Sequence, residues 1–359
     1  MKSLLLFVCS FLPVIVFGDR AKPNLVYILA DDLGYGDLKS MNPEGKIKTP
    51  GSDQMAKEGM VFTDAHSNSA VCTPTRYGVL TGRYAFRSRM KKGVLNGYSS
   101  YLIENGRMTV PSFLQNQGYH TAFIGKWHLG WDWAMDGDKV DYSKPVENGP
   151  KEKGFEYSYG HCGSLDMAPY VWVENGMPTA VPTKETGRSK KDSKNGWWRK
   201  GPTSPDFEHE DVLPNLTRRA VQYVKEQVKK EKPFFLYLAH NTPHAPMQVP
   251  DRWWNKFKDR KLNQDFPKKQ HEKIDHTRAA RAMCENIDWN VGRLMKKLDD
   301  LKIADNTIVI YFSDNGPNGY RWNADMKGKT ISVDNANKLR KIFDKIPHHM
   351  LPAIRKKKI

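Results

Sequence analysis

The most reactive arrangement in the sequence is a cysteine followed four residues later by an arginine, Cys72-Thr-Pro-Thr-Arg76. Pro74 fits the first turn of a helix, because its fixed φ suits that position and its missing N–H is not needed there. The spacing predicts that Cys72 lies at or just before a helix N-terminus, where the helix dipole stabilises negative charge. Arg76 would reach back over one turn towards it. The residues alone allow either a reactive thiol beside a guanidinium or a small buried cysteine.

Polar side chains also follow three apolar runs, each of which predicts a buried parallel strand. The runs are 24–30 before Asp31 and Asp32, 234–239 before His240, and 307–312 before Asp314 and Asn315. Helical patterns over 109–117, 217–230 and about 277–301 lie between them. Alternating strands and helices indicate an α/β fold, in which ligands gather at the carboxyl ends of the strands.

The side chains at two of these strand ends are hard oxygen donors. Asp31, Asp32, Asp314 and Asn315 suit Ca²⁺ or Mg²⁺ rather than Zn²⁺, which favours nitrogen and sulfur ligands. Two further segments, 125–130 (Gly-Lys-Trp-His-Leu-Gly) and 242–246 (Thr-Pro-His-Ala-Pro), each contain a histidine. Taken singly, such histidines are more typical of structural or surface positions.

In combination these segments resemble the type I sulfatase family over most of the chain, from about Lys22 to Lys329. The Cys-x-Pro-x-Arg pattern, with a Leu-Thr-Gly-Arg segment ending at Arg83, resembles the signature that the formylglycine-generating enzyme recognises. The resemblance implies an alkaline-phosphatase-like α/β fold with a mixed, mostly parallel sheet sandwiched by helices. It also implies a sulfuric ester hydrolase that acts on a sulfated glycan or an aryl sulfate.

The resemblance assigns roles to individual residues. Cys72 becomes formylglycine, whose hydrate supplies the attacking hydroxyl, and the divalent cation is Ca²⁺, with Mg²⁺ as the alternative. The metal ligands that it implies are Asp31, Asp32, the modified Cys72, Asp314 and Asn315. The catalytic residues that it implies are Cys72, Arg76, Lys126, His128, His244 and Lys329. Among these, Lys126 and His128 hold the modified residue, His244 donates a proton to the leaving alcohol, and Lys329, with Lys327 second, contacts the sulfate.

The sequence departs from the family pattern after Lys329. The family continues with an acidic-Gly-Gly segment, whereas this chain continues with Thr-Ile-Ser-Val-Asp and then a lysine-rich stretch. We therefore expect a C-terminal subdomain that is largely missing, and an aberrant basic tail over residues 330–359. An alternative is a truncated, inactive relative that only binds anionic ligands. A phosphatase of the same fold is disfavoured, because such enzymes use Ser or Thr nucleophiles and more histidine ligands.

The N-terminus predicts export. Lys2 precedes a short apolar run that gives way to polar sequence at Asp19, which is typical of a signal peptide over residues 1–18, with an uncleaved anchor as the alternative. Residues 19–329 would form the catalytic domain. Cleavage removes Cys9 and leaves three cysteines, an odd number. The mature protein is expected to be periplasmic or secreted, or lysosomal in a eukaryote, without a stable membrane span.

The net charge of +17 does not by itself indicate nucleic-acid binding. The stretch from residue 335 to the end supplies +7 of it, and no nucleic-acid recognition motif is present. The remaining positive surface suits an anionic substrate. The polar, basic segment 184–200 is interpreted as a solvated surface loop, or alternatively as a loop that touches such a substrate.

Overall fold

The structure is a computed structural model that describes residues 22–63, 65–188, 196–230, 232–260 and 274–318. The predicted signal peptide, Lys327, Lys329 and the predicted basic tail lie outside these residues, so the domain boundaries at 18 and 329 remain predictions. None of the helices in the described ranges combines the length and the apolar character that a bilayer span requires.

A mixed sheet of seven strands forms the centre of the described chain. In spatial order the strands are β11 (Thr307–Ser313), β1 (Asn24–Ala30), β10 (Phe234–Ala239), β2 (His120–Lys126), β5 (Tyr157–His161), β6 (Val173–Glu174) and β7 (Met177–Pro178). Neighbouring strands from β11 to β5 pair in parallel, whereas β6 and β7 continue the sheet antiparallel. The predicted mixed, mostly parallel sheet is therefore confirmed.

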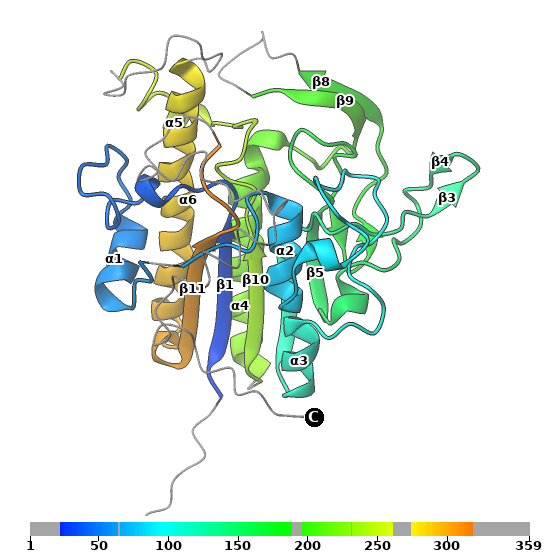
Figure 1. Ribbon diagram of the computed structural model, residues 1–359, viewed down its shortest axis with the longest axis horizontal. Helices are drawn as coiled ribbons and strands as arrows, with labels where there is room; N and C mark the ends of the chain where they lie inside the picture. The colour runs from blue at the N-terminus through cyan, green and yellow to red at the C-terminus, as the bar shows by residue number, and fades with distance from the viewer. Residues whose placement is uncertain (1–21, 64, 189–195, 231, 261–273, 319–359) are drawn as a thin grey trace, which may run out of the picture.

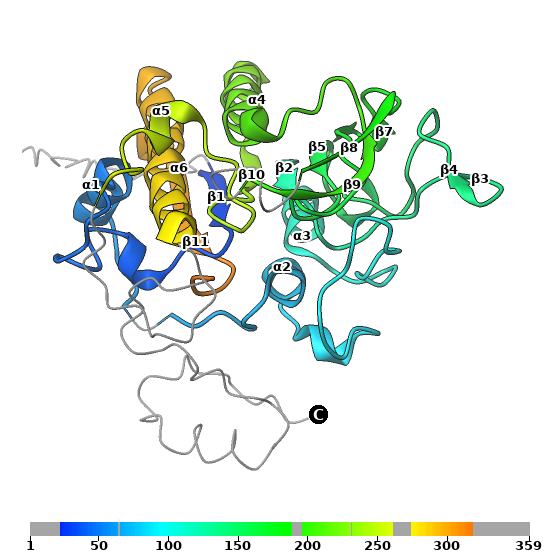
Figure 2. The same ribbon diagram turned by 90° about the horizontal axis from the view of Figure 1, so that it is seen from above.

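Helices cover both faces of this sheet (Figures 1 and 2). On one side lie α4 (Val212–Gln227) and α6 (Ile274–Asp300), with α1 (Pro50–Glu58) and α5 (Asp251–Trp254) packed against α6. On the other side lie α2 (Cys72–Thr81) and α3 (Val110–Asn116). Each side has its own apolar core, and β10, buried along its whole length, contributes alternate residues to both. This alternation follows from the two-residue repeat of a strand.

The main sequence predictions of secondary structure agree with these elements. The predicted strands 24–30 and 234–239 match β1 and β10, and Cys72 is the first residue of α2, after Val71 as N-cap. The predicted helix 109–117 corresponds to α3, which Thr109 caps. The helix predicted over 217–230 begins five residues earlier, as α4, and ends in a short 3-10 turn.

The prediction of a loop over 184–200 is wrong at both ends of that segment. Residues Lys184–Arg188 and Trp198–Thr203 form two antiparallel strands, β8 and β9, on either side of a segment outside the described residues. Their sequence is polar because the hairpin projects from the body of the molecule, so neither strand shows the apolar run by which the buried strands were recognised (Figure 1).

The remaining elements are short. The hairpin β3 (Met135–Asp136) and β4 (Lys139–Val140) projects from the side of the molecule that lies opposite α1 (Figure 1). Short 3-10 helices occupy Tyr35–Asp37, Ala85–Arg87, Lys151–Lys153, His209–Asp211, Val228–Lys230 and Ala304–Asn306.

Candidate active site

Three carboxylates converge where β1 and β11 end. One side-chain oxygen from each of Asp31, Asp32 and Asp314 lies within 4.8 Å of the other two. Two backbone hydrogen bonds beyond the strand ends hold Asp31 and Asp314 in place. The amide of Asp31 donates to the Thr242 carbonyl (3.0 Å), and the amide of Asp314 donates to the Ala30 carbonyl (3.0 Å). The parallel register of neighbouring strands therefore brings together acids that are more than 280 positions apart in the sequence.

Asp32 joins the other two carboxylates through an unusual backbone conformation. Its φ of 62° is in the left-handed region, which a non-glycine residue adopts at an energetic cost. In this conformation its amide donates to Asp314 Oδ1 (3.1 Å), and its own Oδ1 accepts from the side-chain amide of Asn315. Asn315 thus presents its nitrogen to Asp32 and leaves its carbonyl oxygen Oδ1 available.

Two fully buried cations neutralise part of this negative charge. Arg76 Nη2 lies 3.2 Å from Asp314 Oδ2 and 3.5 Å from Asp31 Oδ2, and Lys126 Nζ forms an ion pair with Asp31 Oδ2. The guanidinium is held from behind by the carbonyls of Lys126 (2.9 Å) and His240 (3.2 Å). The ion pairs of Arg76 thus join it to two carboxylates, rather than to the thiol at position 72 that its spacing indicated.

The end of β2 places Lys126 and His128 close to these acids. Gly125 has a φ of 130°, and a Cβ there would lie 1.9 Å from the Ala239 carbonyl, so only glycine allows β2 and β10 to approach this closely. His128 has a positive φ of 54°, and its Nε2 lies 2.8 Å from the Leu95 carbonyl. Lys126 Nζ also donates to Ser164 Oγ (2.8 Å), which fixes the ammonium group between β1 and the loop after β5.

Cys72 lies between two histidines whose pKa values are shifted in opposite directions. Burial and the charge of Lys126 lower the pKa of His128, whereas at His244 burial is outweighed by Asp31, which raises the pKa to about 9. At Cys72 burial opposes ionisation, but Lys126 and hydrogen bonds with both histidines lower the pKa of the thiol to about 4. Near neutral pH the site thus holds a neutral His128 and a protonated His244 beside residue 72.

The two acids that face Arg76 also differ. Burial raises the pKa of Asp31, but Lys126, His244 and Arg76 outweigh it, so its pKa lies well below the usual range. Burial and the negative charge of Asp31 raise the pKa of Asp314 well above its usual value. The cluster therefore holds more acid groups than Arg76, Lys126 and the protonated His244 keep ionised.

The donor set fits a hard divalent cation. Asp31 Oδ1 and Asn315 Oδ1 are buried and accept no hydrogen bond within the described part of the chain. Unpartnered buried oxygens are costly, and carboxylate and amide oxygens are the ligands that Ca²⁺ and Mg²⁺ prefer. Cys72 Sγ is within 4.8 Å of ligand atoms of Asp31 and His244, so residue 72 adjoins the same position.

The structure brings together all the sequence-predicted site residues that it describes, and it adds three to which the family resemblance assigned no role. Ser164 follows β5, a strand that the sequence analysis missed, so no signal pointed to it. Tyr237 is buried within β10 and interacts with Arg76. His240 ends the run 234–239, which would have been a sufficient signal, and its backbone carbonyl rather than its ring contacts Arg76.

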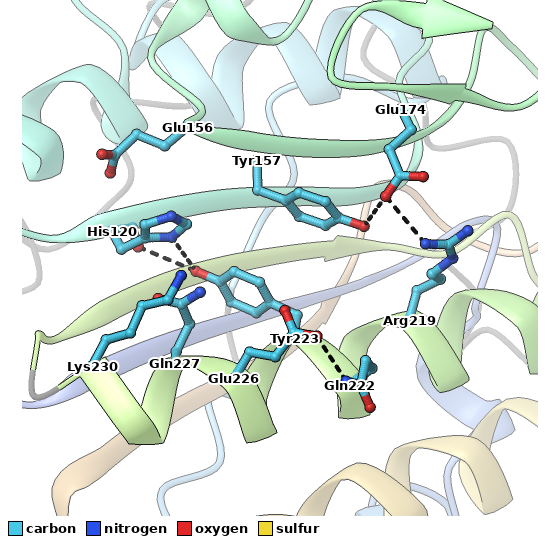
Figure 3. Close-up of a pocket in the computed structure, with 10 residues that line it drawn as sticks. All are labelled: His120, Glu156, Tyr157, Glu174, Arg219, Gln222, Tyr223, Glu226, Gln227 and Lys230. Carbon is cyan, nitrogen blue, oxygen red and sulfur yellow. Dashed lines mark hydrogen bonds and ion pairs between the residues drawn. The ribbon is translucent and has the colours of Figure 1, made fainter. Parts of the chain in front are cut away.

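A second polar cavity of about 250 Å³ lies at the opposite, amino ends of β2 and β5 (Figure 3). Several of its polar groups are paired with neighbours: Glu174 accepts from Tyr157 (2.8 Å) and from Arg219 (3.1 Å), and His120 Nδ1 contacts the Tyr223 hydroxyl (2.9 Å). Most of these side chains are half-buried rather than fully buried. The cavity contains no convergent group of unpaired acids like that at the carboxyl ends.

Comparison with known proteins gives a consistent result. A family profile described as Sulfatase matches residues 23–348. The chain is 31% identical to an N-acetylgalactosamine-6-O-sulfatase of Bacteroides thetaiotaomicron over 82% of this chain and 59% of that protein. It is 30% identical to human arylsulfatase A over 89% of this chain and 56% of that protein. The chain thus spans less than two thirds of the length of these relatives.

Among solved structures, the chain resembles one described under the metabolism of multiple glycosaminoglycans by Bacteroides thetaiotaomicron. The TM-score is 0.66 at 29% identity, and the match covers 83% of this chain and 63% of that one. The profile match continues past residue 329, where the sequence analysis placed the change to the basic tail.

Proposed function

This chain belongs to the sulfatase family, and we propose that it hydrolyses a sulfate ester of a glycan or of an aryl alcohol, with residue 72 as the nucleophile. The observation that carries the proposal is the position of Cys72. It begins a helix beside three buried carboxylates and between two histidines with opposite pKa shifts. The alternative of an inactive relative that only binds anions is less well supported, because the sequence-predicted site residues within the described ranges all lie together around Cys72.

In this proposal Cys72 is converted to formylglycine by the formylglycine-generating enzyme. One hydroxyl of the hydrated aldehyde attacks sulfur, and the bond between sulfur and the leaving alcohol breaks. His244 is protonated at neutral pH and is placed to donate its proton to the leaving oxygen. His128 is neutral and lies beside residue 72, so it is the candidate base for the release of sulfate: it takes the proton of the remaining hydroxyl as the aldehyde re-forms and the bond between carbon and the sulfate oxygen breaks.

The cations of the site oppose the charge of the sulfuryl group. Arg76 and Lys126 are fully buried and held by fixed partners, so they do not need to reorganise as charge develops. Asp31, Asp32, Asp314 and Asn315, with the modified residue 72, would hold Ca²⁺, or Mg²⁺ as the alternative. When bound, the cation would supply Lewis-acid stabilisation of the sulfate oxygens. Lys329 remains the proposed substrate lysine.

The proposal includes export, because the N-terminal segment has the pattern of a signal peptide. The expected partners are therefore the modifying enzyme during maturation and a sulfated substrate outside the cytoplasm.

The function can be tested by the release of sulfate. The chain is co-expressed with the formylglycine-generating enzyme and assayed with an aryl sulfate, a set of sulfated sugars and the matching aryl phosphate. We expect calcium-dependent sulfate release that the Cys72→Ala variant lacks, and slower release of phosphate. Equal rates for the two proteins, or a preference for the phosphate, would contradict the proposal.

A further inference from the structure

The hairpin β8–β9 is held firmly at its base. The Trp198 ring stacks on His209 with centroids 4.0 Å apart, and its Nε1 donates to Thr186 Oγ1 (3.1 Å). The Tyr170 hydroxyl donates to the Arg199 carbonyl (2.7 Å). Figure 1 shows the hairpin at the end of the sheet where β1 and β11 deliver their acids. The described part of the hairpin is therefore a fixed feature at the same end of the sheet as the catalytic centre.

Two side chains connect the hairpin to loops that carry catalytic groups. Arg199 Nη1 binds Asp166 through both its backbone carbonyl (3.1 Å) and its carboxylate. Asp166 is only two residues beyond Ser164, the partner of Lys126, so their Cα atoms are less than about 8 Å apart. On the other side, Gln248 Nε2 contacts the Trp197 carbonyl (3.5 Å), and Gln248 is four residues beyond His244.

Arg199 is built to meet an anion. Its side chain is 61% exposed, and within the described residues only Nη1 of its guanidinium is hydrogen-bonded. Its partner Asp166 is buried, which fixes the direction of the guanidinium. The group lies over the Trp197 ring, 5.6 Å from its centroid. A planar, pre-oriented guanidinium with free N–H groups is the preferred partner of a carboxylate or sulfate.

The next residue provides a contrast. Lys200 is 74% exposed and is paired with Glu185 on the neighbouring strand, at 2.9 Å. Because successive side chains of a strand point to opposite faces, Lys200 and Arg199 face different sides of β9. Of the two cations, only Arg199 is directed to the loop after Ser164.

We propose that Arg199 and Trp197 form the subsite for the sugar next to the sulfated one, and that this subsite selects glycans with an anionic group on that neighbouring sugar. The inference rests on the proposed sulfatase function and refines its substrate class. Trp197 offers an aromatic ring to the sugar, and Arg199 binds the anion in a bidentate manner. The substrate is then a polyanionic glycan rather than a simple aryl sulfate.

The test compares Arg199→Gln with its matched control Lys200→Gln. The probes are a disaccharide with a sulfate on one sugar and a carboxylate on the next, the same disaccharide with the carboxylate reduced to an alcohol, and an aryl sulfate. We expect Arg199→Gln to raise KM about 10-fold for the carboxylated disaccharide alone, with kcat unchanged, because one charge-assisted contact is lost. Lys200→Gln should change each value less than about 2-fold.

Several results would overturn the subsite. Equal effects of the two variants would indicate general attraction of anions, and an equal effect of Arg199→Gln on both disaccharides would show that the carboxylate is not recognised. A loss of aryl sulfate hydrolysis in Arg199→Gln would indicate damage to the fold, and Arg199→Lys, which keeps the charge, would then replace it. In that variant a rise in KM confined to the carboxylated disaccharide is expected, and no rise contradicts the proposal.

Failure of the proposed function gives a different pattern. If the unmutated protein releases no sulfate from any probe, the sulfatase proposal fails, and calorimetric binding of the two disaccharides tests the subsite directly. Tighter binding of the carboxylated form that Arg199→Gln abolishes would support the subsite. Equal binding of the two forms by the unmutated protein would overturn it.

Discussion

The two ends of the central sheet use charged residues in different ways. At the amino ends of β2 and β5, half-buried side chains such as Glu174 and Arg219 pair with each other and with tyrosines (Figure 3). At the carboxyl ends, Asp31 and Asp314 are fully buried with Arg76, and oxygens of the cluster remain without a hydrogen bond. Glu174 and Arg219 at the amino end thus satisfy each other, whereas the carboxyl end holds buried oxygens that a further cation would satisfy.

These two patterns of charge indicate which end of the sheet carries the function. Charged residues that pair with each other at a half-exposed surface add little stability, and the pairing leaves neither of the two groups unpaired to bind a ligand. Buried acids in excess of their cations are costly in isolation, so their presence indicates a bound cation or an anionic reaction partner.

The largest contrast is expected for the two arginines. Arg76→Met leaves two buried carboxylates without their shared partner and should lower the free energy of unfolding by about 3–5 kcal/mol. Arg219→Met removes a half-exposed pair and should cost at most about 1 kcal/mol. Urea unfolding of both variants provides the measurement, and similar losses would remove the distinction between the two ends.

The next contrast concerns the two histidines that face hydroxyl or thiol groups. His244→Gln should lower kcat about 10²–10³-fold, with the larger loss for an alkyl sulfate than for an acidic phenol, because the poorer leaving group depends more on a proton donor. His120→Gln, at the amino end, should leave kcat within about 2-fold. Rates with a series of sulfate esters test this, and a loss that does not depend on the leaving group would count against His244 as the acid.

A smaller effect is expected on calcium-dependent stability. At a calcium concentration 100-fold above Kd, binding to the folded state stabilises by about 2.7 kcal/mol, which corresponds to a rise in Tm of a few degrees. Asp314→Asn should abolish this rise in Tm. In EDTA its Tm should stay near that of the unmutated protein, because the raised pKa of Asp314 makes the neutral amide a close mimic of the protonated carboxyl group. Glu174→Gln should keep the full rise. Retention of the calcium response in Asp314→Asn would show that the cation binds elsewhere.

The sequence was sufficient to predict those parts of the site that follow strong local patterns. The apolar runs of β1, β10 and β11 identify buried strands and so place Asp31, Asp32, Asp314 and Asn315 at one edge. The helix start at Cys72 follows from the preference of proline, here Pro74, for the first turn of a helix. In these segments the burial pattern is visible within a few neighbouring residues.

The parts that were missed depend on pairing between distant segments. The strand β5 contains Ser, Gly and His, and it is a strand because β2 pairs with it, so Ser164 could not be placed from sequence. The polar strands β8 and β9 are likewise strands because they pair with each other, and no apolar run marks them in the sequence. The contact between Arg199 and Asp166 joins positions 33 residues apart through that hairpin, and no local pattern predicts it.

The central claim, that residue 72 is the modified nucleophile, is tested most directly by mass spectrometry of the tryptic peptide from Glu58 to Arg76. The protein is made with and without the formylglycine-generating enzyme, and Pro74→Ala provides the control with a broken recognition pattern. We predict that the peptide from the co-expressed protein has the lower mass expected when –CH₂SH is replaced by –CHO, and that the control keeps its thiol. An unmodified Cys72 in the co-expressed protein would contradict the account.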